Sequence, residues 1–450
     1  MGKFFGTDGV RGVANTELTP TLAYDLGRFG AYVLTKSSMH TPKILVGKDT
    51  RISSDMLECA LVSGILSVGA QVVLLGVVPT PAVAYLTRKY KADAGIVISA
   101  SHNPFQYNGI KFFNQSGFKL PDETEDEIES YILGEKVIED VPVGEKIGRK
   151  TYLKTAVEDY VDFALKCTDI DFSGLKIAID CSNGANFEAA PLAFKRLGAE
   201  VCIINSSPDG ININNDCGSV HIEKLCQHVK DTGADLGIAF DGDADRLIAV
   251  DEKGCAIDGD VIIGLLALDL KKKNKLKNNI VVGTVMSNMG LTLTCKENGI
   301  SLIRSNVGDR YVLEKMLEKG SIIGGEQSGH IISLLDNTTG DALISAIKLI
   351  TLLKESGKPA SVLRKAVTIL PQVLVNARIK NEYKAQMLAD KDVAELISLL
   401  EQKYGNEGRL LVRPSGTEPL VRIMIEGKNT DEMQSDATRL AALFEEKFSV

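Results

Sequence analysis

Short hydrophobic runs recur along the chain, and each is followed by a loop of polar residues. In most of the chain the runs come in pairs with a helical stretch between the two members, and such a pair occurs three times. The first members begin at Ile44, Leu175 and Ile280, and the second members begin at Ala94, Leu236 and Ser321. Short apolar strands that alternate with helices are typical of sheets covered on both faces. The pattern therefore predicts three similar α/β domains with mixed, mainly parallel sheets.

The last part of the chain has a different pattern. Two strand-like runs surround a Pro/Gly loop within residues 409–425, and the amphipathic stretch 431–448 predicts a helix. A smaller C-terminal α+β domain is therefore expected after the three repeats. The expected domain boundaries are 1–155, 156–256, 257–368 and 369–450.

Composition and charge exclude several classes of function. The 450 residues include 51 Lys and Arg against 59 Asp and Glu, and the net charge of −8 is the wrong sign for a nonspecific nucleic-acid binder. No apolar run approaches the ~18 to 20 residues of a membrane helix, and none of signal-peptide length stands at the N-terminus. The eight cysteines include no Cys-x-x-Cys pair and are expected to be reduced. We expect a cytoplasmic protein with no nucleic-acid or membrane partner.

Three carboxylates, of Asp241, Asp243 and Asp245, alternate in a loop after a predicted strand. Hard divalent cations prefer oxygen ligands, and the small residues in between allow the loop to curl so that the carboxylates converge. A calcium loop of EF-hand type is the main competitor, since Glu252 stands at its twelfth position. Arg246 occupies the sixth position, where such a loop needs Gly, and the flanks resemble strands rather than helices. A metal site beside an anionic group is favoured, and a solvated Asp-rich turn stays open.

Two other loops offer polar groups but no decisive signal. Residues 99–104 contain a Ser-His pair, and Lys111 follows, yet adjacency does not make a catalytic dyad and there is no Gly-x-Ser-x-Gly sequence. Residues 413–419 present an Arg, two hydroxyls and a Gly, which suit a phosphate dianion as well as an ordinary hairpin turn. The Gly-rich start, 6–12, fits either a flexible terminus or a loop shaped around an anion. No P-loop or Gly-x-Gly-x-x-Gly sequence supports nucleotide binding.

Taken together, four motifs in order resemble the α-D-phosphohexomutase superfamily over nearly the whole chain. They match its phosphoserine loop at 99–104, its magnesium loop at 241–245, its sugar-binding loop at 325–330 and its phosphate-binding loop at 413–417. Members that act on glucose or mannose phosphates tend to carry Glu-Met-Ser-Gly or Glu-Glu-Ser-Gly in the sugar loop. The Glu-Gln-Ser-Gly-His sequence found here, with segments 5–12 and 306–311, resembles the branch that acts on glucosamine phosphates.

The resemblance implies an isomerase that interconverts glucosamine 6-phosphate and glucosamine 1-phosphate through a phosphoserine and a 1,6-bisphosphate, and so supplies UDP-N-acetylglucosamine for cell-wall synthesis. It implies Mg²⁺ as cofactor and a hexosamine 1,6-bisphosphate as intermediate or activator. The implied residue roles are phosphoryl carrier for Ser101, metal ligand for Ser101, Asp241, Asp243 and Asp245, proton transfer for Lys111 and His330, electrostatic clamp for Arg11 and Arg246, sugar binding for Glu326 and Ser328, and phosphate binding for Arg413, Ser415, Gly416 and Thr417.

Several alternatives stay open at this point. A phosphoglucomutase or phosphomannomutase of the same superfamily would carry the same four loops. A calcium-binding structural protein built on residues 241–252 is the alternative from a different class. His330 also fits a loop histidine with a structural hydrogen bond. Besides a phosphosugar, the expected partners are a second copy in a homodimer and a kinase that first phosphorylates Ser101, unless the chain phosphorylates itself.

Overall fold

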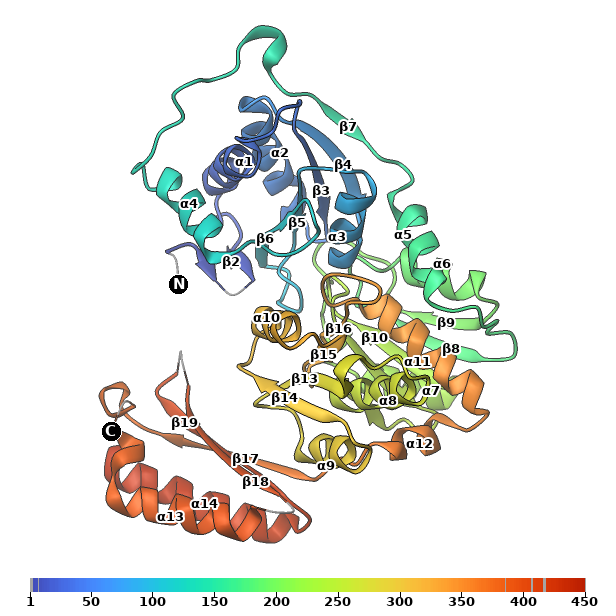
Figure 1. The fold of residues 1–450 in the computed structure, drawn as a ribbon, viewed down its shortest axis with the longest axis vertical. Helices are drawn as coiled ribbons and strands as arrows, with labels where there is room; N and C mark the ends of the chain where they lie inside the picture. Colours follow the sequence, from blue (N-terminus) through green and yellow to red (C-terminus); the bar gives the residue numbers. More distant parts are fainter. Residues whose placement is uncertain (1–2, 7, 385, 406–407, 416–417, 450) are drawn as a thin grey trace. The chain divides into compact units, whose positions relative to one another are not determined.

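The structure is a computed structural model that describes residues 3–6, 8–384, 386–405, 408–415 and 418–449. The chain forms two compact units (Figure 1). The first consists of residues 1–286 and 300–366, and the second consists of residues 287–299 and 367–450. Within the described residues, none of the helices combines the length and the apolar character needed to span a membrane.

The first unit contains three sheets, and each sheet with its helices is called a domain below. The first domain has a seven-stranded sheet of order β1-β2-β6-β5-β3-β4-β7, in which β3 pairs in parallel with β4 and β5, and β4 pairs in parallel with β7. The strands are β1 Phe5–Gly6, β2 Gly9–Val13, β3 Lys43–Lys48, β4 Gln71–Val77, β5 Ala94–Ile98, β6 Tyr107–Asn114 and β7 Lys150–Tyr152. The helices are α1 Pro20–Thr35, α2 Ser53–Ser67, α3 Thr80–Lys89 and α4 Asp122–Ile132.

Helices cover both faces of this first sheet, as expected for buried, near-continuous apolar strands. Alternate residues of β3, such as Ile44 and Val46, belong to one buried cluster with residues from α1, α2 and α4. On the other face, a Cβ on Gly47 would lie 2.7 Å from the side chain of Val83 in α3, so the helix packs close to the strand there. This face brings α3 beside the end of β3, next to the polar loops.

The second and third domains repeat the plan with smaller sheets, of order β12-β11-β10-β8-β9 and β14-β13-β15-β16. Both mix parallel and antiparallel pairs. The second contains β8 Lys176–Asp180, β9 Glu200–Ile204, β10 Leu236–Phe240, β11 Leu247–Asp251, β12 Ala256–Ile257, α5 Ala156–Ala164, α6 Ala189–Arg196 and α7 Glu223–Thr232. The third contains β13 Ile280–Thr284, β14 Ser301–Ser305, β15 Ile323–Gly325, β16 Ile331–Ser333, α8 Gly259–Lys272, α10 Asp309–Lys319, α11 Ala342–Ser356 and α12 Ala360–Leu363.

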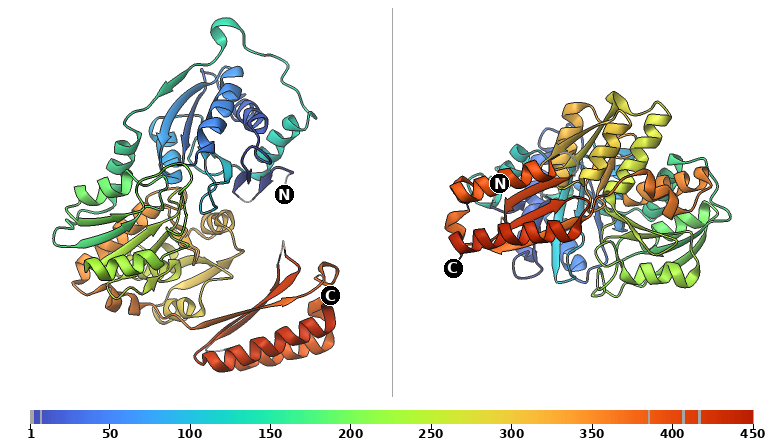
Figure 2. Two further views of the ribbon diagram at one scale, coloured as in Figure 1. Left: turned by 180° about the vertical axis from the view of Figure 1, so that it is seen from behind. Right: turned by 90° about the horizontal axis from the view of Figure 1, so that it is seen from below.

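The second unit is an antiparallel sheet of order β17-β19-β18 with two long helices on one face (Figure 1 and Figure 2). Residues from the strands and from both helices form one buried cluster, which includes Ile423, Leu400 and Phe444. The elements are β17 Gln372–Arg378, β18 Arg409–Pro414, β19 Leu420–Glu426, α13 Lys391–Tyr404, α14 Thr430–Phe448 and the short helix α9 Met289–Glu297. The helix predicted for residues 431–448 is therefore confirmed.

The expected fold class of three α/β domains with mixed sheets and a smaller C-terminal α+β domain is confirmed. One strand is displaced: the run expected to begin at Ser321 forms β15 at Ile323–Gly325 instead. A Cβ on Gly324 would lie 2.7 Å from both Met316 Sδ and Val282 O, so the glycine allows close packing inside the sheet. Gly325, which was expected to begin the sugar-binding loop, therefore ends this strand.

Candidate active site

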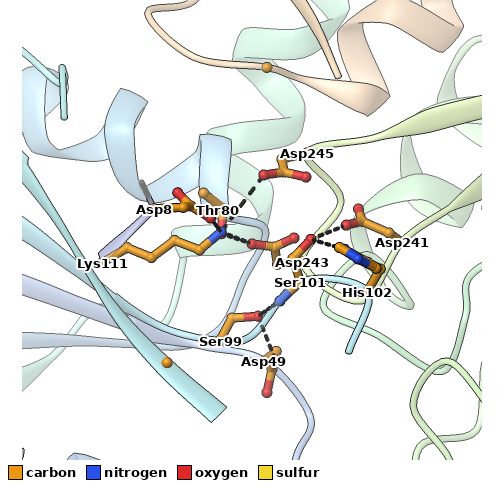
Figure 3. Close-up of polar contacts among 12 residues, drawn as sticks. Asp8, Asp49, Thr80, Ser99, Ser101, His102, Lys111, Asp241, Asp243 and Asp245 are labelled. Carbon is orange, nitrogen blue, oxygen red and sulfur yellow. Dashed lines mark hydrogen bonds and ion pairs between the residues drawn. The ribbon is translucent and has the colours of Figure 1, made fainter. Parts of the chain in front are cut away.

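The polar loops of the first and second domains meet through Ser101. Ser101 follows β5, and its Oγ donates a hydrogen bond to Asp241 Oδ2, which follows β10, over 2.6 Å. Lys111, on β6, places its Nζ 2.7 Å from Asp243 Oδ2. Figure 3 shows Ser101 and Lys111 directed toward the carboxylates of the second domain. Both side chains are almost fully buried, so these contacts lie out of bulk water.

The three carboxylates of Asp241, Asp243 and Asp245 converge as expected. Each offers an oxygen within 4.8 Å of the others, and all three side chains are buried. Between them Ala244 adopts a left-handed backbone with φ 57°, which curls the loop. Asp243 Oδ1 and Asp245 Oδ1 are buried and have no hydrogen-bond partner among the described residues. Buried carboxylate oxygens without donors fit a divalent cation, which takes oxygen ligands.

The pKa values of Asp241 and Asp245 are shifted in opposite directions. Burial and the neighbouring charges of Asp245 and Asp243 hold the pKa of Asp241 well above its ordinary value. Burial also acts to raise the pKa of Asp245, but the attraction of Lys111 and His330 outweighs it and lowers that pKa. Desolvation opposes the charge of Lys111, yet Asp243, Asp8 and Asp245 raise its pKa and keep the amine protonated. A cation near Asp241 would offset the negative charge of this cluster.

A closed ring of ionisable side chains passes through Asp245 and joins all three domains. Lys111 Nζ lies 2.8 Å from Asp8 Oδ2 and 3.7 Å from Asp245 Oδ2. His330 Nδ1 lies 3.5 Å from Asp245 Oδ2. Lys119 pairs with both Asp8 and Asp309, and Asp309 Oδ2 lies 3.8 Å from His330 Nε2. The ring runs in the order Lys111, Asp8, Lys119, Asp309, His330 and Asp245.

His330 is a member of this ring and is not exposed on an open loop. Burial acts to lower its pKa, but Asp245 and Asp309 raise it above the ordinary value. Its Nε2 accepts a hydrogen bond from Gly340 N at 3.2 Å. A Cβ on Gly340 would lie 2.5 Å from that nitrogen, so the backbone closely confines the imidazole.

A cavity of about 340 Å³ opens beside the ring in the first unit. Arg11, Arg246 and Glu326 line it together with Asp245, whereas Ser328 is exposed on the adjoining loop. Glu326 Oε1 accepts a hydrogen bond from Gly308 N at 3.0 Å, which fixes one of its oxygens. The cavity is lined by Phe4, Gly6, Asp8, Gly9, Arg11, Asp245, Arg246, Val307, Gly308, Asp309 and Glu326.

The expected phosphate loop belongs to the second unit. Arg413 ends up on β18, opposite Arg422 of β19, and Ser415 is buried with its N bonded to Leu420 O at 2.8 Å. Gly416 and Thr417, which were expected to bind phosphate with them, lie outside the described residues.

The calcium-loop alternative is wrong. The Asp loop lies between strands β10 and β11, not between helices. Glu252, which would be the twelfth-position ligand, accepts hydrogen bonds from Ser361 N at 2.9 Å and from Ser361 Oγ.

The sequence pattern did not point to several residues of the site. Asp8 and Asp309 lie inside segments that carried the resemblance, but no role was assigned to them. Thr80, at the start of α3, donates to Asp243 Oδ2 at 2.7 Å. Lys119 had no signal beyond being one of many lysines, because its two acidic partners are 111 and 190 positions away.

Comparisons with known proteins identify the family of this chain. Sequence models of the phosphoglucomutase/phosphomannomutase family match the chain in order: domain I at residues 2–138, domain II at 151–254, domain III at 258–369 and the C-terminal domain at 374–443. A phosphoglucosamine mutase of Acetivibrio thermocellus is 57% identical over 447 residues, which is 99% of this chain and 100% of that protein.

Solved structures share the fold at lower identity. A phosphoglucomutase/phosphomannomutase family protein of Burkholderia thailandensis has a TM-score of 0.80 at 24% identity, over 97% of this chain and 96% of that one. An Aspergillus fumigatus N-acetylphosphoglucosamine mutase, solved in complex with GlcNAc-6P and magnesium, has a TM-score of 0.68 at 18% identity, over 98% and 96% of the two chains. The full-length identity and the four matched domains together place the chain among the phosphoglucosamine mutases of the α-D-phosphohexomutase superfamily.

Proposed function

We propose that this chain interconverts glucosamine 6-phosphate and glucosamine 1-phosphate by carrying a phosphoryl group on Ser101. The observation that carries the proposal is the 2.6 Å contact between Ser101 Oγ and Asp241 within three buried, convergent carboxylates. As a phosphoserine, Ser101 could share a cation with this cluster, because phosphate and carboxylate oxygens both suit a divalent ion. Membership of the phosphoglucosamine mutases supports the amino sugar as the substrate.

Asp241, Asp243 and Asp245 are proposed to hold Mg²⁺ with the phosphate on Ser101. The unpartnered oxygens of Asp243 and Asp245 support this, as does the magnesium in the Aspergillus fumigatus structure. When bound, Mg²⁺ neutralises charge on the transferring phosphoryl group. The protein's own part is to bring the carboxylates and Ser101 together in a site without bulk water.

The reaction needs two transfers of opposite direction. In the first, the Oγ–P bond of phosphorylated Ser101 breaks as a sugar hydroxyl forms a new O–P bond. The hydroxyl gives up its proton, and Ser101 Oγ takes one up as it leaves phosphorus. This gives a hexosamine 1,6-bisphosphate, which turns over and returns its other phosphoryl group to Ser101. Arg11 and Arg246 line the cavity beside Asp245, and we propose that they hold the reacting phosphoryl group.

Lys111 and His330 are the proposed groups for proton transfer. Three carboxylates keep Lys111 cationic, so the amine has a proton to give but no lone pair to accept one, and its raised pKa makes it a weak acid. His330 is oriented by Asp245 and Asp309, at 3.5 and 3.8 Å. Together with the Gly340 backbone, these neighbours confine the imidazole ring.

The sugar must bind in two opposite orientations, so the residues that recognise it must use contacts that both orientations share. Glu326 and Ser328 are proposed to bind hydroxyls present in both orientations. Arg413, Ser415, Gly416 and Thr417 of the second unit are proposed to bind the phosphate that is not reacting. Binding this remote dianion positions the reacting hydroxyl.

The test is direct conversion of the amino sugar. Purified protein is incubated with glucosamine 6-phosphate, Mg²⁺ and a trace of glucosamine 1,6-bisphosphate, and glucosamine 1-phosphate is followed by ³¹P NMR. We expect conversion to equilibrium, with kcat/KM higher for the amino sugar than for glucose 6-phosphate or mannose 6-phosphate. Faster turnover of a hydroxy sugar would assign the chain to a different substrate, and no turnover of any of the three would refute the proposal.

A further inference from the structure

The backbone of Ser101 is held in an unusual conformation. Its φ is 51°, in the left-handed region, which costs a non-glycine residue free energy and persists only where the surroundings fix it. Ser101 N is fixed within the first domain: it donates to Ser99 Oγ at 3.1 Å, and Ser99 Oγ donates to Asp49 Oδ2 at 2.6 Å (Figure 3). The carbonyl side of the same residue is held by other groups.

Two buried side chains from different domains hold the carbonyl side. Arg51 Nη2 donates to Ser101 O at 3.1 Å and to Asn103 O at 2.5 Å. Asn214 Nδ2 donates to the same two oxygens, at 2.9 and 3.1 Å. Each donor group thus bridges the backbone on both sides of His102. Because Ser101 O and Asn103 O are both acceptors, the NH2 end of the Asn214 amide must face the loop.

Arg51 is itself rigidly placed. Its Nη1 lies 2.8 Å from Asp49 Oδ2, and its Nε donates to Tyr107 O at 2.8 Å. The side chains of Arg51 and Asp49 are both 0% exposed. The guanidinium therefore spans Asp49, the serine loop and the start of β6, as a planar fork of donors allows.

Asn214 brings the second domain to the same point. It lies on the loop between β9 and α7, its own φ is 57°, and its N bonds to Ser182 O at 2.9 Å. Its Oδ1 is buried with no hydrogen-bond partner among the described residues, which disfavours folding. A Cβ on Gly242, in the Asp loop, would lie 2.5 Å from Ser101 O and 2.8 Å from Asn214 Nδ2. The amide, the serine loop and the Asp loop are thus packed together.

We propose that Asn214 and Arg51 are positioning residues that hold the Ser101 backbone in register with Asp241 while the serine gains and loses its phosphoryl group. This inference rests on the proposed function. In-line phosphoryl transfer depends on placement, and a shift of about 1 Å can cost about 100-fold in rate. Neither side chain needs to touch the sugar, so the effect falls on the transfer step and not on substrate binding.

The test compares Asn214→Ala and Arg51→Lys with Asn212→Ala. Asn212 lies on the same loop as Asn214, but its side chain bonds to Ser207 O and Asp209 N of that loop. Each full-length variant is loaded on Ser101 from ³²P-labelled glucose 1,6-bisphosphate, and transfer to glucosamine 1-phosphate is measured in a single turnover. Steady-state KM and thermal unfolding are measured alongside.

We expect transfer from Ser101 to slow by about 10- to 100-fold in Asn214→Ala and in Arg51→Lys, with KM unchanged within about twofold. Asn212→Ala should transfer at the wild-type rate. The inference is overturned if either variant, folded as judged by unfolding, transfers at the wild-type rate, or if Asn212→Ala slows equally. If one variant does not fold, the other decides. A wild-type chain that accepts no label on Ser101 would refute the proposed function instead.

Discussion

Ser101 Oγ lies 2.6 Å from Asp241 Oδ2, although the two residues are 140 positions apart and belong to different sheets. The contact joins the proposed phosphoryl carrier to the proposed metal site. Its formation requires the first and second domains to pack against each other, so activity and domain packing are expected to be lost together.

Removal of one carboxylate should separate stability from activity. Asp241→Asn replaces a carboxyl with a neutral amide, and the charged form of that carboxyl is already disfavoured because burial, Asp245 and Asp243 raise its pKa. Without metal, the variant should unfold at a temperature no lower than wild type. Its mutase activity in Mg²⁺ should fall by roughly 100-fold or more, because a ligand for the cation is lost. EDTA should likewise abolish wild-type activity, and excess Mg²⁺ should restore it; full activity in EDTA would contradict the metal site.

The charged ring should matter for stability at Lys119. Lys119→Met removes the cation that pairs with both Asp8 and Asp309. Asp8 keeps Lys111, but the largely buried carboxylate of Asp309 is left without its lysine. Loss of one partner from such a pair is expected to cost about 3 kcal/mol of unfolding free energy, measured in urea. Lys36→Met is the control, because the Lys36 side chain is 43% exposed in its pair with Glu127 and should cost at most about 0.5 kcal/mol. Equal effects of the two substitutions would show that the ring does not stabilise the fold.

Stability should depend on pH through His102. Burial, followed by Arg246 and Arg11, lowers its pKa from 6.5 to about 4. Between these values the unfolded chain binds a proton that the folded chain does not. The contribution of His102 to the unfolding free energy is therefore fully present above this window and is lost as the pH falls through it. In His102→Asn this part of the pH dependence should disappear. Chemical denaturation at several pH values between 4 and 7 measures it, and identical slopes for variant and wild type would refute the prediction.

The second unit should contribute to substrate affinity through Arg413. Arg413→Lys keeps the charge but loses the planar fork that binds phosphate with two hydrogen bonds. We expect KM for glucosamine 6-phosphate to rise about tenfold with a smaller change in kcat. Arg422→Lys, at the paired position on β19, is the control and should leave KM unchanged, because Arg422 pairs with Glu418. A similar KM for both variants and wild type would remove Arg413 from the phosphate site.

Much of this structure could be predicted because its signals are local. The apolar runs of β5 and β10 are continuous, and both strands are fully buried. The Asp loop carries its three carboxylates within five residues, so their convergence could be predicted from spacing and from the small residues between them. The three α/β domains followed from the repeated runs, and the smaller fourth domain followed from the change of pattern after them. The expected boundaries stay a prediction.

The contacts between domains could not be predicted in the same way. Lys119, Thr80 and Asn214 meet partners that lie more than 100 positions away in the chain. Their types and their immediate neighbours are ordinary, and only the packing of one domain on another gives them a role. The displacement of β15 has a different origin, because Gly324 packs against Met316 and Val282 of its own domain.

The phosphate on Ser101 tests the central claim most directly. Intact mass and phosphopeptide mapping are measured before and after the protein is exposed to glucosamine 1,6-bisphosphate, with Ser101→Ala as the control. The account predicts a single phosphate on Ser101 that is gained from the bisphosphate and lost to glucosamine 1-phosphate, and none in the variant. A chain that interconverts the two sugar phosphates while Ser101 stays unmodified, or a Ser101→Ala variant that turns over at the wild-type rate, would contradict it.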